Sequence, residues 1–131
     1  MSIQKILYIE DEDDIRTVVS MILRRSGIEV EAYACSQEAI DGSVDSQPDL
    51  MLLDISMPQK DGFETLAELR QRPGYESIPA VFMTARSDSK LEDLDQFHPV
   101  ALIIKPFNPS SLKDELESIL ESISLEGHGN P

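Results

Sequence analysis

Short, unbroken apolar runs recur along the chain, and such runs are typical of strands that are buried on both faces of a parallel sheet. The four runs lie at residues 6–9, 50–53, 80–83 and 100–104. A fifth segment, 29–33, alternates acidic and apolar residues, so we expect it to form a half-exposed strand at an edge of the sheet. The pattern therefore predicts five strands.

Between the predicted strands, the apolar positions change to the spacing of three and four residues that marks one face of a helix. The predicted helices lie around residues 15–23, 39–40, 63–67, 88–96 and 112–123. Gly27 should end the first of them, because glycine adopts the left-handed conformation that often follows a helix. Asp13 is expected to cap the start of this helix, and Asn108-Pro109 the start of the last one.

Five alternations of strand and helix predict an α/β fold, a doubly wound five-stranded parallel sheet with five helices on its two faces. We expect one domain over residues 1–123, since 131 residues provide a single core. Residues 124–131 contain Gly127, Gly129 and Pro131 and are expected to form a flexible tail.

The charge balance narrows the range of partners. Eleven Lys and Arg residues against 25 Asp and Glu residues give a formal net charge of −14, which disfavours direct contact with nucleic acid or with an anionic membrane surface. The single cysteine, Cys35, is typical of a reducing compartment. The sequence shows neither a signal peptide nor an apolar run of about 20 residues, the length of a membrane span. We therefore expect a soluble cytoplasmic protein.

Reactive side chains gather where the predicted strands end. Glu10-Asp11 follow the first strand, Asp54 the third, Thr84 the fourth and Lys105 the fifth. Because ligands bind at the carboxyl ends of the strands in open parallel sheets, these groups should meet at one edge. Three adjacent carboxylates repel one another unless a cation joins them, and Mg²⁺ is an oxygen-binding cation that needs few protein ligands.

This set of side chains points to phosphoryl transfer. The strand ends carry no Ser/His/Asp or Cys/His arrangement, whereas an ionised aspartate beside a metal can itself act as a nucleophile. A transferred phosphoryl group needs positive charge and hydrogen-bond donors around its oxygens, which Mg²⁺, Lys105 and the Thr84 hydroxyl would provide. Asp54 is therefore predicted to be the phosphoryl acceptor.

Four segments of the sequence carry a resemblance to a known family. They read ILYIEDEDDIR, LMLLDISMPQKDGFE, AVFMTARSD and ALIIKPFNPSSL. In order and spacing they resemble the four signature segments of bacterial two-component response-regulator receiver domains. The resemblance extends from residue 5 to about residue 123 and implies a flavodoxin-like, chemotaxis-regulator-like fold with strand order 2-1-3-4-5.

The resemblance also implies a function. A phosphoryl group would pass from a histidine kinase or a histidine phosphotransfer protein to an aspartate, in a Mg²⁺-dependent reaction of a two-component system or phosphorelay. Such a phosphoprotein of signal transduction is not an enzyme, although it takes part in its own phosphorylation and autodephosphorylation. We expect a stand-alone monomer or weak dimer whose signal leaves by contact with an unknown target protein, without nucleic acid or membrane.

The metal site follows from the resemblance position by position. Asp54 resembles the phospho-acceptor, and Asp11 resembles the acidic residue that binds the metal directly. Glu10 resembles its partner, which holds metal-bound water, and the backbone carbonyl of Ser56 would complete the protein ligands.

Three further positions match the family. Thr84 resembles the switch hydroxyl, and Lys105 resembles the lysine that pairs with the acceptor and the phosphate, with a cis Lys105–Pro106 bond implied. Gly62, in the loop after the acceptor, is expected to serve the geometry of the turn, where it is free to take a positive φ.

The sequence departs from the family at Glu10 and Leu102. Glu10 stands where aspartate is commoner, and its side chain is longer by one methylene. Leu102 stands at the switch position, where the family usually has tyrosine or phenylalanine. We therefore expect phosphorylation to shift residues 85–96, with little rearrangement of Leu102.

Two other functions fit parts of this pattern. A pseudo-receiver would use the fold only to dock to a protein; the altered switch position favours it, and the complete acidic, Thr84 and Lys105 set argues against it. A phosphatase with an aspartate nucleophile, of the haloacid-dehalogenase kind, would need a cap domain and a second aspartate at the position of Ser56. The sequence shows neither.

Overall fold

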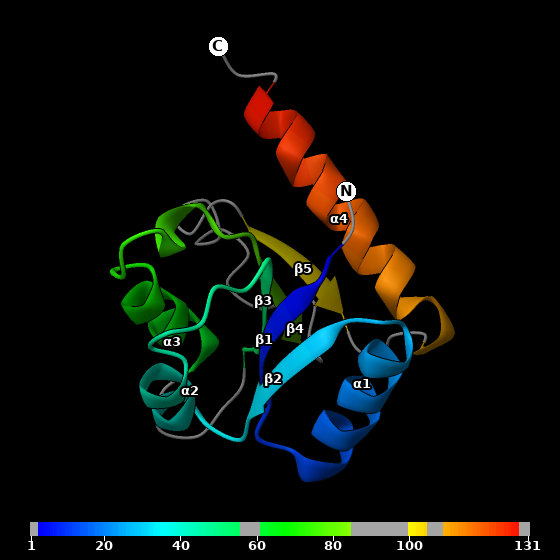
Figure 1. The fold of residues 1–131 in the computed structure, drawn as a ribbon, viewed down its shortest axis with the longest axis horizontal. Coiled ribbons are helices and arrows are strands. Elements are labelled where there is room, and N and C mark those ends of the chain that lie inside the picture. Colours follow the sequence, from blue (N-terminus) through cyan, green and yellow to red (C-terminus); the bar gives the residue numbers. More distant parts are fainter. Residues whose placement is uncertain (1–2, 56–60, 85–99, 105–108, 129–131) are drawn as a thin grey trace.

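Five strands form one parallel sheet in the order β2-β1-β3-β4-β5. They are β1 (Lys5–Ile9), β2 (Glu29–Tyr33), β3 (Leu50–Asp54), β4 (Ala80–Thr84) and β5 (Val100–Ile104). The computed structural model describes residues 3–55, 61–84, 100–104 and 109–128 of the chain. It confirms the predicted strands, their order and the position of β2 at an edge (Figure 1).

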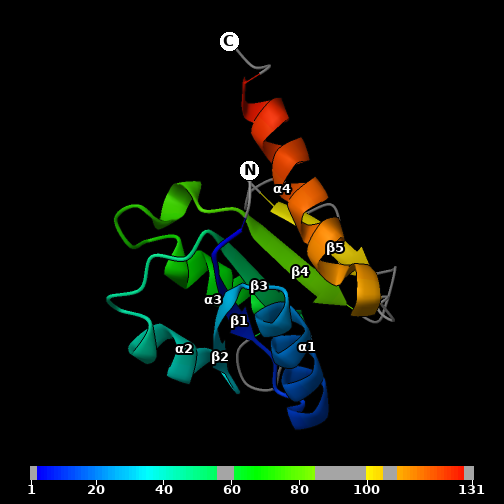
Figure 2. The same ribbon diagram turned by 45° about the vertical axis from the view of Figure 1, so that its right-hand side comes forward.

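Four α-helices lie on the two faces of the sheet within these described ranges. They are α1 (Asp13–Arg25), α2 (Ser36–Gly42), α3 (Gly62–Leu69) and α4 (Leu112–His128), with 3₁₀ turns at Tyr75–Ser77 and Pro109–Ser111. α1 and α4 cover one face, and α2 and α3 cover the other (Figure 1 and Figure 2). This is the predicted doubly wound arrangement. The fifth expected helix, at 88–96, lies outside the described residues.

The last helix runs further than the sequence predicts. α4 continues beyond Ile123 to His128, and its far end extends past the sheet in both views (Figure 1 and Figure 2). Buried leucines at positions 112, 116 and 120 pack its first turns into the core. The domain boundary at residue 123 and the flexibility of residues 124–131 remain predictions. No helix in the described part of the chain is both long enough and apolar enough to cross a membrane.

Alternating side chains on the central strands divide the core into two apolar clusters. On β1, Ile6 and Tyr8 join the cluster beneath α1 and α4, whereas Leu7 and Ile9 join the cluster beneath α2 and α3. The residues of β3 alternate in the same way. Because helices cover both faces, the central strands are apolar at almost every position, which explains the unbroken apolar runs.

The end of α1 confirms the predicted role of Gly27. The amide of Gly27 donates to the carbonyl of Arg24 (3.0 Å), and the amide of Ile28 donates to the carbonyl of Leu23 (3.1 Å). Gly27 has a φ of 87°, which a residue with a side chain adopts only at a cost. These contacts form a Schellman motif that turns the chain from α1 into β2.

The start of α1 differs from the prediction. Glu12, not Asp13, is the N-cap residue, and its side chain makes no capping hydrogen bond. Asp13 is the first residue of the helix and pairs with Arg16, one turn further on. Any acidic residue in the first turn interacts favourably with the helix dipole. The run of acidic residues therefore did not show at which of them the helix begins.

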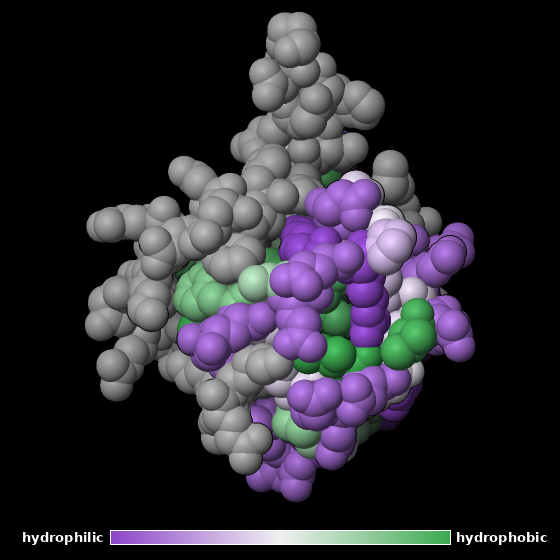
Figure 3. Space-filling view, turned by 90° about the vertical axis from the view of Figure 1, so that its left-hand side faces the viewer, coloured by the Kyte–Doolittle hydropathy of each residue, from purple (hydrophilic) through white to green (hydrophobic). Residues whose placement is uncertain are grey.

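Polar contacts close the edge of the sheet at β2. The Glu31 carboxylate accepts hydrogen bonds from the hydroxyls of Tyr33 and of Ser46 (2.7 Å), and it lies 3.4 Å from the Lys5 ammonium. Burial opposes the charge of Glu31, but these donors outweigh it and lower its pKa. Burial and the same carboxylate raise the pKa of Tyr33 to about 12. Hydrophilic side chains cover much of the described part of the neighbouring face, which carries α2 and α3 (Figure 3).

The Glu31 contacts predict a pH-dependent contribution to stability. The pKa of Glu31 in the folded protein lies below its ordinary value of 4.5, so the contribution is complete above pH 4.5 and is lost as the pH falls through the folded-state pKa. In Glu31→Gln, the free energy of unfolding should be lower at neutral pH and should fall less on acidification, as measured by urea denaturation. Glu38→Gln removes an exposed carboxylate of α2 and is the control. The same pH dependence in Glu31→Gln and wild type would contradict this assignment.

Candidate functional site

The carboxyl ends of β1 and β3 bring three carboxylates together. β1 and β3 pair with Ile9 beside Leu53, so the next residues along the two strands, Glu10 and Asp54, come side by side. Asp11 follows directly. One carboxylate oxygen from each of these three acids lies within 4.8 Å of the other two. We call Glu10, Asp11 and Asp54 the acidic cluster, and all three are residues that the sequence singled out.

The acidic cluster is largely removed from water. Glu10 is fully buried and Asp54 is 4% exposed, whereas Asp11 is half-buried. The Oδ1 atom of Asp11 is buried and has no hydrogen-bond partner within the described part of the structure. Closely spaced, buried anions and an unsatisfied carboxylate oxygen oppose folding unless a cation offsets them.

The donor set of the acidic cluster fits a small divalent cation. The cluster offers only carboxylate oxygens, which Mg²⁺ prefers, and no histidine or cysteine of the kind that zinc favours. Mg²⁺ usually binds through one or two carboxylates and keeps several waters, so three acids provide enough protein ligands. The unsatisfied Oδ1 of Asp11 is a ligand atom with no competing partner among the described residues. The cluster can therefore hold Mg²⁺.

Hydrogen bonds from both sides fix the backbone of Glu10. The guanidinium of Arg16 on α1 donates to the carbonyl oxygen of Glu10 (2.8 Å), and the amide of Glu10 donates to the carbonyl of Tyr33 on β2 (3.1 Å). The Glu10 carboxylate accepts a further hydrogen bond from the amide of Glu12 (3.3 Å). Glu10 is thus held by the helix on one side and by the neighbouring strand on the other.

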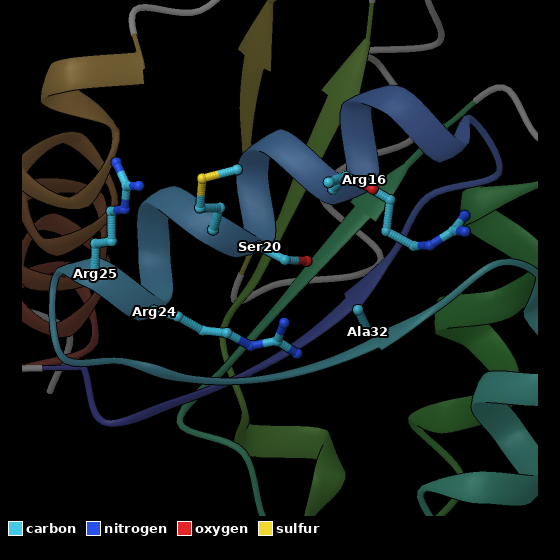
Figure 4. A pocket seen from close by; sticks show the side chains of 7 residues that line it. Arg16, Ser20, Arg24, Arg25 and Ala32 are labelled. Carbon is cyan, nitrogen blue, oxygen red and sulfur yellow. The ribbon is translucent and has the colours of Figure 1, made fainter.

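Arg16 also lines a groove of about 540 Å³ between α1 and β2 (Figure 4). Arg24 and Arg25 line it too, and Figure 4 shows the three arginine side chains pointing in different directions. Arg16 binds the Glu10 backbone, and Arg24 donates to the carbonyl of Val30 on β2 (2.9 Å). Figure 4 shows Arg24 extending from α1 beside β2. These contacts join α1 to the edge of the sheet and thereby support the position of Glu10.

The loop after β3 leads into α3 through a capping box. Asp61 Oδ1 accepts a hydrogen bond from the amide of Glu64 (2.9 Å), and the Glu64 carboxylate accepts one from the amide of Asp61 (3.1 Å). The amide of Gly62 donates to the carbonyl of Ile55 (3.0 Å). The first turn of α3 is therefore attached directly to the end of β3.

Gly62 is required by a close approach to Asp54. A Cβ atom at position 62 would lie 2.6 Å from the backbone carbonyl oxygen of Asp54. Gly62 does not adopt the positive φ that was open to it, because within the described residues only Gly27 and Gly74 have one. Gly62 instead lets α3 begin against the backbone of the predicted phospho-acceptor.

Sequence analysis missed one polar group near the acidic cluster, the Tyr8 hydroxyl. Tyr8 is fully buried, and its hydroxyl lies near the Glu10 carboxylate without a well-formed hydrogen bond within the described ranges. Burial and the charges of Glu10 and Asp54 raise the pKa of Tyr8, although the charge of Arg16 opposes them. A tyrosine inside an apolar run is usually part of the core. The available signal was its spacing, two residues before Glu10 and hence on the same face of the strand.

The other predicted site residues are only partly described. Thr84 is the last residue of β4 and pairs with Ile104, but its side chain lies outside the described part, as do Ser56 and Lys105 entirely. Their roles, the cis Lys105–Pro106 bond and the shift of residues 85–96 remain predictions. Leu102 is described: it pairs with Phe82 and is partly buried against the apolar cluster beneath α2 and α3.

Comparison with known proteins identifies the class of protein that this fold and acidic cluster represent. The family described as "Response regulator receiver domain" matches residues 6–117. The chain belongs to this family, as the resemblance of its four segments implied. It is therefore a receiver domain of the two-component response regulators, a signalling module.

Curated relatives agree with this assignment. Response regulator Rre1 of Synechocystis sp. is 36% identical over 121 residues, which are 90% of this chain and 50% of that protein. The alkaline phosphatase synthesis transcriptional regulatory protein PhoP of Bacillus subtilis is 31% identical over 122 residues, 89% of this chain and 48% of that protein. The chain thus spans about half the length of these curated relatives.

Solved structures confirm the chemotaxis-regulator-like fold. The chemotaxis protein CheY4 of Vibrio cholerae is 29% identical with a TM-score of 0.83, and the match covers 90% of this chain and 99% of that one. The response regulator TrrA of Thermotoga maritima, solved in complex with Mg²⁺ and BeF, is 26% identical with a TM-score of 0.75, covering 88% and 98%.

The close approach at Gly62 predicts a coupled loss of stability and of cation binding. In Gly62→Ala, the added methyl group must displace α3 or the Asp54 backbone, so the free energy of unfolding should fall by about 1–3 kcal/mol. The same displacement should weaken Mg²⁺ binding, measured by calorimetric titration. Gly27→Ala is the control: it meets no atom within 4 Å, is destabilised by its positive φ alone, and should bind Mg²⁺ as wild type does. Wild-type Mg²⁺ affinity in Gly62→Ala would show that this approach does not position Asp54.

Proposed function

We propose that this receiver domain is a stand-alone response regulator of a two-component system or phosphorelay. In this proposal Asp54 accepts a phosphoryl group from the phosphohistidine of a histidine kinase or a histidine phosphotransfer protein. The observation that carries the proposal is the acidic cluster, in which three carboxylates converge within 4.8 Å and one Asp11 oxygen is buried and unsatisfied. Such a site binds a divalent cation and holds a nucleophilic carboxylate beside it.

Each residue of the acidic cluster has a distinct task in this reaction. An oxygen of the Asp54 carboxylate attacks the phosphorus atom, the bond from phosphorus to the histidine nitrogen breaks, and an acyl phosphate forms on Asp54. Asp11 and Asp54 would bind Mg²⁺, Glu10 would act through metal-bound water, and the Ser56 carbonyl would complete the protein ligands. When bound, Mg²⁺ supplies positive charge beside the oxygens of the transferred group.

Two further side chains are proposed from the family resemblance. The Lys105 ammonium would offset the remaining negative charge of the phosphoryl group, and the Thr84 hydroxyl would donate a hydrogen bond to it. Attack of water on the phosphorus atom of the acyl phosphate would release inorganic phosphate and restore Asp54. Phosphorylation is thereby reversible, as a signal requires.

The comparisons support Mg²⁺ as the cofactor, and they are compatible with two forms of the protein. The TrrA structure in complex with Mg²⁺ and BeF supports the use of Mg²⁺ by the equivalent cluster here. The match to almost the whole CheY4 chain supports the proposal of a stand-alone protein, whereas its place in the cytoplasm and its signalling through protein contact are proposed from the family resemblance. The match to half of Rre1 and PhoP would instead suit a receiver attached to a further domain. The mass of the intact protein in its native cells distinguishes these forms.

The proposal predicts a single, saturable phosphorylation at Asp54. Wild-type protein incubated with Mg²⁺ and acetyl phosphate should gain one phosphoryl group in intact-protein mass spectrometry, whereas Asp54→Asn should gain none, because an amide is a poor nucleophile. Asp45→Asn, which changes an exposed aspartate outside the acidic cluster, is the control and should behave as wild type.

Two results would favour the alternatives. Wild-type protein that takes up no phosphoryl group would be a pseudo-receiver that only docks to a protein. Continuous release of phosphate over many turnovers from phosphate esters, dependent on Asp54, would indicate a phosphatase with an aspartate nucleophile.

An exposed apolar pair on α1 is the proposed contact for the phosphodonor protein. Val18 and Met21 are 45% and 42% exposed and lie one turn apart on the helix that follows Glu10 and Asp11. Apolar side chains at an exposed helix face are the anchors that a partner helix can cover. Because α1 begins two residues after Asp11, a partner that covers this pair and extends toward the start of the helix would bring a phosphohistidine toward Asp54.

This contact predicts a selective defect in transfer from a protein donor. In Val18→Gln/Met21→Gln, transfer from a phosphorylated histidine kinase should slow by about tenfold, equivalent to about 1.4 kcal/mol, because apolar contact is lost. Phosphorylation by acetyl phosphate should be unchanged, since the acidic cluster is intact. Val44→Gln removes an equally apolar side chain that is 65% exposed elsewhere on the surface and is the control. Equal slowing in Val44→Gln, or none in the double variant, would exclude this face as the donor contact.

A further inference from the structure

The Tyr8 hydroxyl is the polar group for which the proposed phosphoryl transfer provides no role. Tyr8 is fully buried in the cluster beneath α1 and α4, and its hydroxyl lies near the Glu10 carboxylate without a well-formed hydrogen bond in the described part of the chain. A phenylalanine would fill almost the same volume without a buried, unsatisfied hydroxyl, which opposes folding. The hydroxyl therefore needs a partner that satisfies it in some state of the protein.

Strand geometry places the acidic cluster within reach of this hydroxyl. Tyr8 and Glu10 are two residues apart on β1, so their side chains leave the same face, with Cα atoms about 6.6 Å apart. Tyr8 pairs with Leu52, and Asp54 follows two residues later on the same face of β3. A tyrosine hydroxyl is protonated at neutral pH. It is therefore a neutral donor beside two carboxylates.

Glu10 is the carboxylate on which such a donor acts most directly. A glutamate side chain has one more rotatable bond than an aspartate and can place its carboxylate in more positions. The backbone of Glu10 is fixed by Arg16 and by Tyr33, and its carboxylate accepts a long hydrogen bond (3.3 Å) from the amide of Glu12. A hydrogen bond from a rigid phenol, whose ring is held by the core, would select one of these positions.

We propose that Tyr8 is a positioning residue for Glu10, whose hydroxyl donates to the Glu10 carboxylate and holds it toward a divalent cation in the acidic cluster. The inference rests on the proposed function only in requiring that the cluster binds Mg²⁺. Tyr8 and Glu10 then act as a pair. The glutamate side chain, longer than that of aspartate, reaches the Tyr8 hydroxyl, and the hydroxyl holds the Glu10 carboxylate in one position. An aspartate at position 10 would be too short to use the same donor.

The test is a double-mutant cycle on Mg²⁺ affinity, measured by calorimetric titration of the intact protein. Tyr8→Phe should weaken Mg²⁺ binding by about tenfold, the low end of the effect of outer-shell partners of metal ligands. In the Glu10→Asp background, adding Tyr8→Phe should change the affinity by less than about twofold, because the pair no longer exists. Tyr33→Phe, which removes the hydroxyl that contacts Glu31, is the matched control and should bind Mg²⁺ as wild type does.

Two readouts separate positioning from a defect in packing. The melting temperature of Tyr8→Phe without Mg²⁺ should equal or exceed that of wild type, because an unsatisfied buried hydroxyl has been removed. The chain has three tyrosines and no tryptophan, so Mg²⁺ should also change the tyrosine absorbance of wild type and of Tyr33→Phe, but not of Tyr8→Phe.

The outcomes distinguish this inference from the proposed function. Wild-type affinity in Tyr8→Phe, or an equal loss in both Glu10 backgrounds, would overturn the role of Tyr8 while Mg²⁺ binding by wild type stands. Failure of wild type to bind Mg²⁺ would overturn both.

Discussion

The repulsion among Glu10, Asp11 and Asp54 is the constraint on which the rest of the structure depends. Their oxygens lie within 4.8 Å of one another, and two of the three side chains are almost completely buried. Like charges at such distances interact strongly where water is excluded. Because Ile9 pairs with Leu53, the residues that follow them, at positions 10 and 54, must nevertheless lie side by side. The sheet, its two apolar clusters and the contacts to the Glu10 backbone therefore hold together a site that would separate if it were free to do so.

The fold was predictable wherever local pattern and tertiary environment agree. Strands covered by helices on both faces are apolar throughout, so β1, β3 and β4 were visible as unbroken runs. The end of α1 was predictable because glycine readily adopts the positive φ that ends a helix, as Gly27 does here. The start of α1 was not, since aspartate is the preferred capping residue and yet Glu12 occupies the N-cap without a side-chain hydrogen bond. The extent of α4 past residue 123 was not predictable either, because a glycine weakens a helix without ending it.

The acidic cluster was predictable, and the groups that position it were not. Parallel strands present their carboxyl ends at one edge, so the places of Glu10, Asp11 and Asp54 follow from the order of elements. The need for glycine at position 62 arises from the Asp54 carbonyl, a contact between segments that no local pattern reveals. The Tyr8 hydroxyl is similar: its apolar neighbours mark it as core, and only the register of β1 on β3 shows that it faces two carboxylates. The side-chain roles of Thr84 and Lys105 still rest on the resemblance alone.

The two faces of the sheet separate the acidic cluster from the expected switch position. Asp54 continues the face of Leu52, beneath α1 and α4, whereas Leu102 lies on the opposite face against Phe82. Within the described residues, a change at Asp54 can reach Leu102 through the paired backbones of β3, β4 and β5, in which Leu53 pairs with Phe82 and Phe82 with Leu102. The Phe63 ring packs 4.8 Å from that of Phe82, so closely packed neighbours surround this part of the sheet. An aliphatic side chain at position 102 is compatible with such packing, and under the proposed function it favours a response carried by the strand ends rather than by a moving ring.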